Sequence, residues 1–260
     1  MLILNKKKDG HVHTPFCPHG TDDQFDKYIH KAIEAKREEI SFTEHFPMPQ
    51  GVTSTEFYEE CVLLESQVES YIMKVKEVKK KYETNIKINL GFEVDYIEGK
   101  EEEIQAMLEK YGLEIEDSIL SVHFVRFDNI YYAIDYLPEF ESLLNKVGSI
   151  QQVYDIYFKT LLKSIKADLG PFKPKRIGHP TLVRIFNRKY PCQYTNYELL
   201  EEIVMAIKDR AYEIDYNVAG LRKPYCQEVY PSGEMLRLLV DNNVRMTYGT
   251  DAHKSDDMMG

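Results

Sequence analysis

The chain has 260 residues, of which 43 are acidic and 33 basic, and its formal net charge is −10. This length suits one α/β domain with a sizeable core, and the acidic balance argues against a nucleic-acid partner, which needs clustered Lys and Arg. The four cysteines form no CxxC pair, the N-terminus lacks the apolar segment of a signal peptide, and no run approaches the about 20 apolar residues of a membrane span. We therefore expect a cytoplasmic protein with reduced thiols and no membrane partner.

Short apolar runs alternate with amphipathic segments in the first half of the chain. The pattern predicts strands at residues 2–12, 39–43, 86–94 and 117–124, separated by helices at 22–37, 54–83 and 100–111. In the first helix Phe25, Ile29 and Ile33 recur every four residues, as expected for one buried helical face. This alternation of strand and helix is typical of a parallel sheet.

Residues 125–148 break the alternation. The segment is aromatic and irregular, with Tyr131, Tyr132, Tyr136 and Phe140, and we interpret it as an insertion. The alternation resumes with helices at 149–168, 196–209 and 232–242 and strands at 174–178, 211–217 and 244–248. The seven strands predict a parallel α/β barrel in a single domain of residues 1–260, with a doubly wound sheet as the alternative.

Histidines gather at the predicted strand ends. The chain has eight histidines, and seven of them fall at, or just past, the C-terminal end of a predicted strand, whereas His30 lies inside a helix. The C-terminal ends of barrel strands meet on one face of the molecule, so these side chains are expected to converge there. The seven are His11, His13, His19, His45, His123, His179 and His253.

The strand-end motifs carry residue types that bind metal ions. Residues two apart on a strand point to the same side, so His11 and His13 can face one ion. Glu93 lies at the end of an apolar strand, where a carboxylate is costly unless it is paired or binds a metal. Each motif alone is better explained by a hydrogen-bonded core histidine or a loop residue. Together with Asp251 they supply nine donor residues, too many for one ion and suited to two or three.

The ordered motifs HxH, EH, GxE, SxH, GH and a terminal DAH resemble the PHP (polymerase and histidinol phosphatase) superfamily over residues 9–253. The resemblance implies a distorted (β/α)7 TIM-like barrel with the active site at the C-terminal ends of the strands. It also implies three divalent ions (Zn, Fe, Mn or Co), with Asp9 and Glu44 orienting the metal ligands without binding an ion themselves. The implied metal ligands are His11, His13, His19, His45, Glu93, His123, His179, Asp251 and His253.

Within the superfamily, the SVHF motif, the aromatic insertion and the Asn-x-Ala-Gly-x-Arg stretch that ends at Arg222 resemble the histidinol-phosphate phosphatases. The resemblance implies hydrolysis of this small phosphate ester, with Arg222 and Arg184 gripping phosphate through their planar guanidinium groups. A surface salt bridge is the alternative for either arginine. Asp251 or a ligand histidine such as His253 would pass a proton to the leaving oxygen, and Asp128 of the insertion would face the substrate's amino and imidazole groups.

Three other functions stay open from the sequence. Relatives in the superfamily include nucleases, against which the acidic balance counts, and protein-tyrosine phosphatases. A non-catalytic metal-binding regulatory protein is the alternative of another class, and the complete ligand pattern argues against it. The sequence suits a monomer or a small homo-oligomer.

Overall fold

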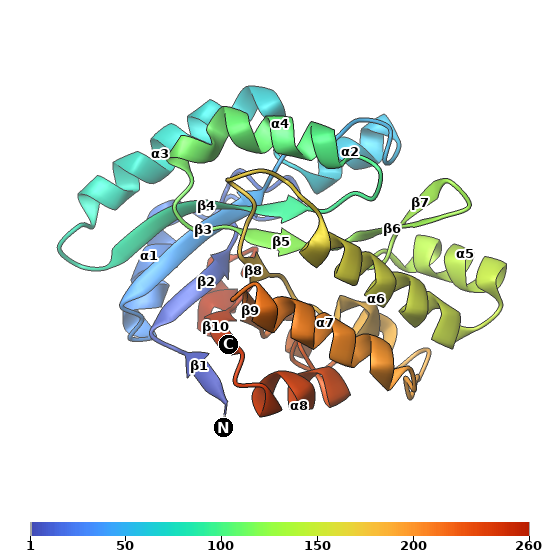
Figure 1. Ribbon diagram of the computed structural model, residues 1–260. Coiled ribbons are helices and arrows are strands. Elements are labelled where there is room, and N and C mark those ends of the chain that lie inside the picture. The colour runs from blue at the N-terminus through green and yellow to red at the C-terminus, as the bar shows by residue number, and fades with distance from the viewer. Residues whose placement is uncertain (1, 260) are drawn as a thin grey trace.

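The computed structural model describes residues 2–259, apart from the side chains of residues 55 and 56 (Figure 1). The end residues 1 and 260 of the predicted domain lie outside the described part. The sheet contains eight parallel strand segments: β1 (Ile3–Asn5), β2 (Lys8–Val12), β3 (Glu39–His45), β4 (Lys87–Asp95), β5 (Ile119–Ser121), β8 (Arg176–Ile177), β9 (Glu213–Asn217) and β10 (Arg245–Gly249). Their order is β1-β10-β9-β8-β5-β4-β3-β2.

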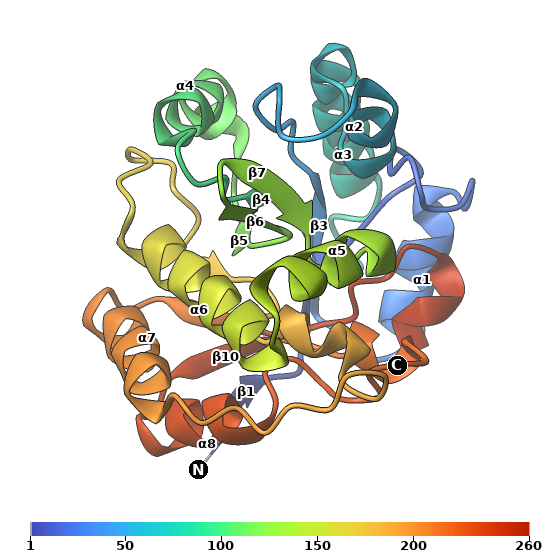
Figure 2. The same ribbon diagram turned by 90° about the vertical axis from the view of Figure 1, so that its right-hand side faces the viewer.

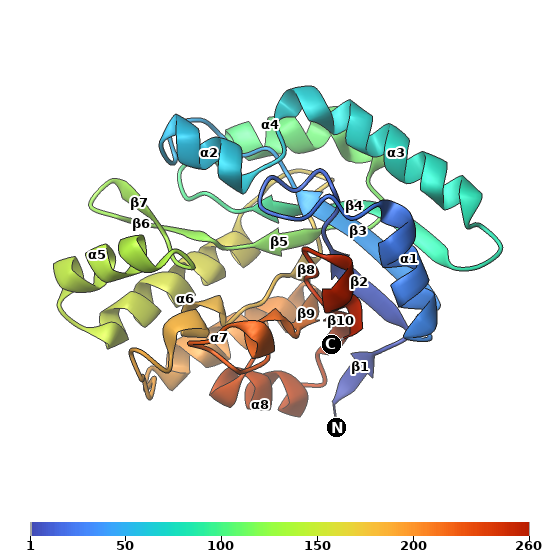
Figure 3. The same ribbon diagram turned by 180° about the vertical axis from the view of Figure 1, so that it is seen from behind.

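The sheet curls into a nearly closed barrel, seen from behind in Figure 3. β1 pairs with β10 and β2 pairs with β3, so the two segments are parts of one broken first strand. The end of β2 then meets the segment after β10: Val12 bridges Ala252, the His13 amide donates to the Ala252 carbonyl at 3.0 Å, and the Asp251 amide donates to the His11 carbonyl at 2.7 Å. The eight segments thus occupy seven positions, which confirms the seven-stranded barrel and excludes the doubly wound sheet.

Helices surround the strands, as Figure 2 shows in the view along the barrel. Apolar residues on the strands and on the inner faces of these helices form a continuous core, and eight of the nine residues of β4 are buried, as expected for a parallel strand covered on both faces. The helices are α1 (Phe25–Glu34), α2 (Thr55–Cys61), α3 (Val68–Lys81), α4 (Glu101–Tyr111), α5 (Leu137–Val147), α6 (Ile150–Lys166), α7 (Tyr197–Asp209) and α8 (Gly233–Asp241). None of the described helices is long and apolar enough to cross a membrane.

Two predicted elements are interrupted in the structure. The helix predicted at residues 54–83 is two helices, α2 and α3, because Val62 is extended and the Leu63 amide donates to the His45 carbonyl at 3.2 Å. The strand predicted at residues 117–124 leaves the barrel after Ser121. The next residues form an antiparallel hairpin of β6 (Phe124–Phe127) and β7 (Ile130–Ala133).

This hairpin and α5 make up the predicted insertion. In Figure 1 they extend past the ends of the barrel strands, and in Figure 2 α5 lies in front of the barrel. The Ile134 amide donates to the His123 carbonyl at 2.8 Å, which fastens the insertion to the strand end it follows. The insertion therefore borders the face where the strands end.

The opposite end of the barrel holds an ion pair between buried Arg176 and half-buried Asp117. The Arg176 guanidinium donates to both carboxylate oxygens of Asp117 at 2.8–2.9 Å and to the Gly10 carbonyl at 2.7 Å. Burial would raise the pKa of Asp117, but Arg176 and Lys8 outweigh it and lower that pKa. These residues close the barrel at the strand starts, away from the predicted site.

Candidate metal centre

The predicted ligands converge where the barrel strands end. His11 and His13 lie on or just after β2 and are fully buried, and Glu93 on β4 is 2% exposed. The oxygen and nitrogen donors form overlapping groups, with Glu93 in two of them. A carboxylate and two imidazoles this deeply buried need mutual contacts or a cation to offset the cost of desolvation.

The first group joins the HxH pair to both predicted acidic ligands. Nε2 of His11 and Nε2 of His13 are 3.3 Å apart. Glu93 Oε2 lies 3.3 Å from Nε2 of His11 and 3.5 Å from Nε2 of His13, and Asp251 Oδ1 lies 3.6 and 3.3 Å from the same atoms. Four donor atoms from three strand ends thus surround one point.

The second group uses the other oxygen of Glu93. Glu93 Oε1 lies 2.9 Å from Nε2 of His179 and 3.6 Å from Nε2 of His123. Ser121 donates to the same oxygen at 2.6 Å. Because the two carboxylate oxygens face different groups, Glu93 is placed to bridge two ions.

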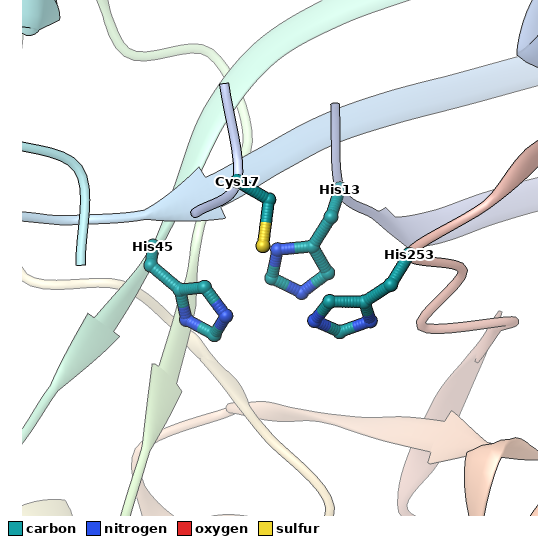
Figure 4. A group of neighbouring side chains, drawn as sticks. All are labelled: His13, Cys17, His45 and His253. Atoms are coloured by element: carbon teal, nitrogen blue, oxygen red, sulfur yellow. The ribbon is translucent and has the colours of Figure 1, made fainter. Parts of the chain in front are cut away.

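The third group lies on the side of the loop that follows β2. Nε2 of His19 and Nε2 of His45 are 3.2 Å apart, and the rings of His19 and His253 stack at 4.9 Å between centroids. The ring of His13 stacks on His253 at 3.9 Å and joins this group to the first. Figure 4 shows the thiol of Cys17 beside the rings of His13, His45 and His253.

Five of these histidines share one hydrogen-bonding arrangement. In each, Nδ1 is placed to donate to a protein oxygen, which leaves Nε2 facing the other donors, as in metal-binding imidazoles. The partners and distances are Asp215 for His11 (2.8 Å), Glu44 for His13 (3.2 Å), the Glu60 carbonyl for His19 (2.8 Å), Asp95 for His123 (2.7 Å) and the Asp251 carbonyl for His253 (3.1 Å).

The spacing of these atoms fits metal ions. Two nitrogens bound to one tetrahedral zinc ion at about 2.0–2.1 Å stand about 3.3–3.4 Å apart. The facing Nε2 pairs lie at 3.2 and 3.3 Å. The donor set of imidazoles and carboxylates therefore suits divalent metal ions in both chemistry and spacing.

The packing of the strand ends holds this arrangement in place. A Cβ atom on Gly249 would come within 2.3 Å of Asp215 Oδ1 and 2.7 Å of His11 Cβ, so only glycine allows Asp215 to reach the His11 ring. Asn217 donates to Asp215 at 3.0 Å and to Asp251 at 3.0 Å. These contacts fix the ring of His11 and the carboxylate of Asp251 relative to each other.

Sequence reasoning missed several of these supporting residues. It proposed Glu44 and Asp9 as orienting groups. Glu44 contacts the His13 ring. Asp9 accepts hydrogen bonds from the amide and hydroxyl of Thr250 and from the backbone amide of His11, but it contacts no ligand ring. Asp215 and Asn217 were not proposed, although two polar residues at alternate positions of a buried strand are a usable signal.

The charges of the ligands are strongly coupled. Burial would raise the pKa of Glu93, but His11 and His123 outweigh it and lower that pKa well below its usual value. Burial would lower the pKa of His123, but Asp95 and Glu93 outweigh it and raise that pKa to about 10. Without an ion, protonated imidazole thus balances the buried carboxylates at neutral pH.

Zinc binding at pH 7 is therefore expected to release protons. His123 is protonated in the ion-free protein because its pKa lies above 7, and the ion must displace that proton from Nε2. Apparent zinc affinity should rise by about tenfold per pH unit for each proton released as the pH increases from 7 toward 9. Calorimetric titrations in two buffers of different ionisation enthalpy measure the release, and equal heats in both buffers would contradict it.

A cavity of about 420 Å³ opens onto the three groups. Its lining includes three basic residues: Arg222, Lys223 and Lys254. Nη2 of Arg222 donates to the carbonyls of Thr250 and Asp251 at 2.7 and 3.1 Å, which holds the guanidinium at the cavity wall. Asp257 also lines the cavity, and its carboxylate lies 3.5 Å from Nε of Arg222 and 3.8 Å from Nζ of Lys254. The cavity thus brings three basic groups, partly paired with one carboxylate, beside the metal ligands.

Two residues proposed from the sequence lie elsewhere. The guanidinium of Arg184 is not among the described groups that line this cavity, because it pairs with both carboxylate oxygens of Glu228 at 2.6 and 2.8 Å. Asp128 lies exposed at the tip of the β6–β7 hairpin, with φ of 50°. Asp135, after β7, lines the cavity instead.

Comparison with known proteins identifies the family of this chain. The family model for the PHP domain matches residues 9–219. The histidinol-phosphatase of Bacillus subtilis is 39% identical over 256 residues, covering 97% of this chain and 96% of the relative. The chain therefore belongs to the PHP domain family. Within that family it belongs to the histidinol-phosphatase subfamily.

Solved structures give the same result for the fold. A Listeria monocytogenes protein assigned as a histidinol phosphatase superposes with a TM-score of 0.89 at 34% identity, covering 96% of both chains. The histidinol phosphate phosphatase of Lactococcus lactis, complexed with zinc, L-histidinol and phosphate, superposes with a TM-score of 0.68 at 20% identity, covering 97% of this chain and 88% of that one. The second likeness concerns the fold alone.

Proposed function

We propose that this chain is a metal-dependent phosphomonoesterase that hydrolyses histidinol phosphate to histidinol and phosphate. The observation that carries the proposal is the position of Glu93, whose two oxygens face two groups of histidines beside a cavity whose lining includes three basic residues. The names of the relatives that cover nearly the whole chain support the substrate.

We assign the nine predicted ligands to three divalent ions. His11, His13, Glu93 and Asp251 would hold the first ion, Glu93 with His123 and His179 the second, and His19, His45 and His253 the third. Imidazole and carboxylate ligands suit Zn, Fe, Mn or Co, and the zinc in the Lactococcus lactis structure favours zinc. When bound, such ions lower the pKa of a water toward ~7 and neutralise charge on phosphoryl oxygens.

The chain's own residues bind and orient the phosphate. Arg222, Lys223 and Lys254 would face the phosphoryl oxygens that do not contact the ions. A guanidinium suits this role because its N–H groups match two phosphate oxygens at once. We propose that Asp251 or His253, which both line the cavity, passes the proton to the leaving oxygen.

A second cavity offers a site for the alcohol part of the substrate. It has a volume of about 330 Å³, and its lining shares His19, His45, His123 and Asp135 with the first cavity. Its other lining residues include the aromatic rings of Phe57, Phe124 and Tyr136 and the carboxylates of Glu60 and Asp95. Aromatic rings and carboxylates are suited to an imidazole and an ammonium group.

Replacing Asp135 with asparagine is expected to raise KM for histidinol phosphate by about fivefold, equivalent to about 1 kcal/mol. The substitution removes a negative charge that lies between the two cavities and that would face the substrate ammonium. The kcat/KM for 4-nitrophenyl phosphate, which has no cation, should stay unchanged. Asp128→Asn, at the exposed hairpin tip, is the matched control; an equal rise in KM for both substrates would exclude Asp135 from cation recognition.

The test of the proposed function is turnover of histidinol phosphate by purified protein with its metal content measured. A phosphotyrosine peptide and a short oligonucleotide tested in parallel separate this activity from those of a protein-tyrosine phosphatase and a nuclease. Protein that contains its metal ions and hydrolyses none of the three would instead support a non-catalytic metal-binding protein.

The remaining properties are also proposals. We expect a small-molecule phosphate ester as the partner, without nucleic acid or membrane, and a monomer or small homo-oligomer. The four cysteines are free thiols, which supports the cytoplasm as the location.

A further inference from the structure

The loop between β2 and α1 brings a thiol into the third histidine group. Cys17 follows His13 by four residues, and its side chain is 6% exposed. Its sulfur and one nitrogen each of His13, His45 and His253 all lie within 4.8 Å of one another. Figure 4 shows the sulfur pointing toward these rings rather than away from them.

Hydrogen bonds fix the backbone that carries this thiol. The Cys17 amide donates to the Thr14 carbonyl at 3.0 Å, and the Cys17 carbonyl accepts from the Gly20 amide at 3.1 Å. The loop is then tied to two strand ends, because the Thr14 amide donates to Glu44 at 3.0 Å and the Thr21 amide donates to the His253 carbonyl at 3.1 Å. The position of the sulfur therefore follows from the same strand ends that position the histidines.

The other three thiols have different surroundings. Cys226 is as buried as Cys17, yet its thiol points to the Glu228 carbonyl at 3.8 Å. Cys61 and Cys192 are half-buried. Among the described residues, Cys17 is the one cysteine that belongs to a group of possible metal donors. A buried thiol that served only for packing would not need to face three imidazole rings.

We propose that Cys17 is a thiolate ligand of the ion held by the third group, in addition to His19, His45 and His253. Of these histidines, His45 and His253 lie in the 4.8 Å group with the sulfur, and His19 joins that group through the 3.2 Å contact between its Nε2 and Nε2 of His45. The inference rests on the metal binding proposed above but not on the substrate. Three imidazoles and one thiolate form a tetrahedral zinc set, with Zn–N at about 2.0–2.1 Å and Zn–S at about 2.3 Å. The thiolate also supplies a negative charge to a group of otherwise neutral rings.

This ligand would make the third site chemically different from the other two. Thiolate is a soft donor that favours zinc, whereas carboxylate and water favour manganese or magnesium. The first and second groups contain carboxylate and imidazole only. We therefore expect the third site to select zinc or cobalt over manganese, while the other two sites accept a wider range of ions.

The test is the absorption spectrum of the full chain after its ions are removed and replaced with Co²⁺. A thiolate bound to Co²⁺ gives a charge-transfer band in the near ultraviolet, which imidazole and carboxylate ligands do not give. The wild-type protein should show the band. Cys17→Ser should bind cobalt and lose the band, whereas Cys226→Ser, the control at an equally buried thiol, should keep it.

A second variant keeps the test decisive if Cys17→Ser does not fold. In a triple variant that replaces Cys61, Cys192 and Cys226 with serine, Cys17 is the one remaining thiol and the band should persist. A wild-type protein that binds cobalt without the band would overturn the role of Cys17 and leave the proposed metal centre intact. Failure to bind cobalt at all would overturn both.

Discussion

Replacing Glu93 with glutamine is expected to lower kcat/KM for histidinol phosphate by about a thousandfold or more, equivalent to about 4 kcal/mol of transition-state stabilisation. The two carboxylate oxygens face different donor groups: Oε2 lies 3.3 Å from Nε2 of His11 and Oε1 lies 2.9 Å from Nε2 of His179. A glutamine keeps one acceptor oxygen and presents an NH2 group where the second ion would bind. Loss of the bridge should therefore remove at least one ion.

Metal content and kcat/KM measured on the same preparation test this expectation. Asp117→Asn is the control, since Asp117 is a half-buried carboxylate of the same barrel but pairs with Arg176 at the opposite end. The control should lower the thermal unfolding temperature and keep the metal content and kcat/KM. A Glu93→Gln protein with a full set of ions and more than a tenth of the wild-type kcat/KM would exclude the bridging role.

The repeating features of the fold could be predicted from the sequence because they depend on local periodicity. The period of two in the HxH motif placed His11 and His13 on one side of β2, and the structure brings their Nε2 atoms to 3.3 Å. Glu93 was recognisable because a carboxylate in an apolar strand needs a partner. The convergence of distant motifs followed from the rule that barrel strands end on one face.

The features that the sequence did not predict depend on contacts between distant segments. The ion pair of Arg184 is with Glu228, 44 residues away, and no local pattern distinguishes a guanidinium paired with a carboxylate from one free to bind phosphate. The choice between Asp128 and Asp135 depends on the register of the β6–β7 hairpin, which puts Asp128 at the tip. The sequence alone does not distinguish Cys17 from the other three cysteines, because its position beside the histidine rings depends on the fold of the loop.

The second large effect is expected for Arg222→Ala, which should raise KM and lower kcat/KM by about a hundredfold, equivalent to about 2.7 kcal/mol. The 3-10 helix η4 (Ala219–Arg222) places this guanidinium in the wall of the cavity. Nη2 is held by the carbonyls of Thr250 and Asp251, and Nε lies 3.5 Å from the carboxylate of Asp257, so Nη1 remains to donate to phosphate without a further ordering cost. Arg222→Lys should give an intermediate kcat/KM because it keeps the charge and loses the paired N–H groups.

Arg184→Ala separates phosphate binding from structural support. The guanidinium of Arg184 pairs with Glu228, so its loss should lower the thermal unfolding temperature and leave KM within about twofold of wild type, a change of about 0.4 kcal/mol or less.

The metal content of the Arg222→Ala protein decides between two roles of Arg222, phosphate binding and positioning of Asp251, because the Arg222 guanidinium also contacts the Asp251 carbonyl. Full metal content with a raised KM means that Arg222 binds phosphate. Loss of an ion means that it positions Asp251, and an unchanged KM with full metal content removes Arg222 from the site.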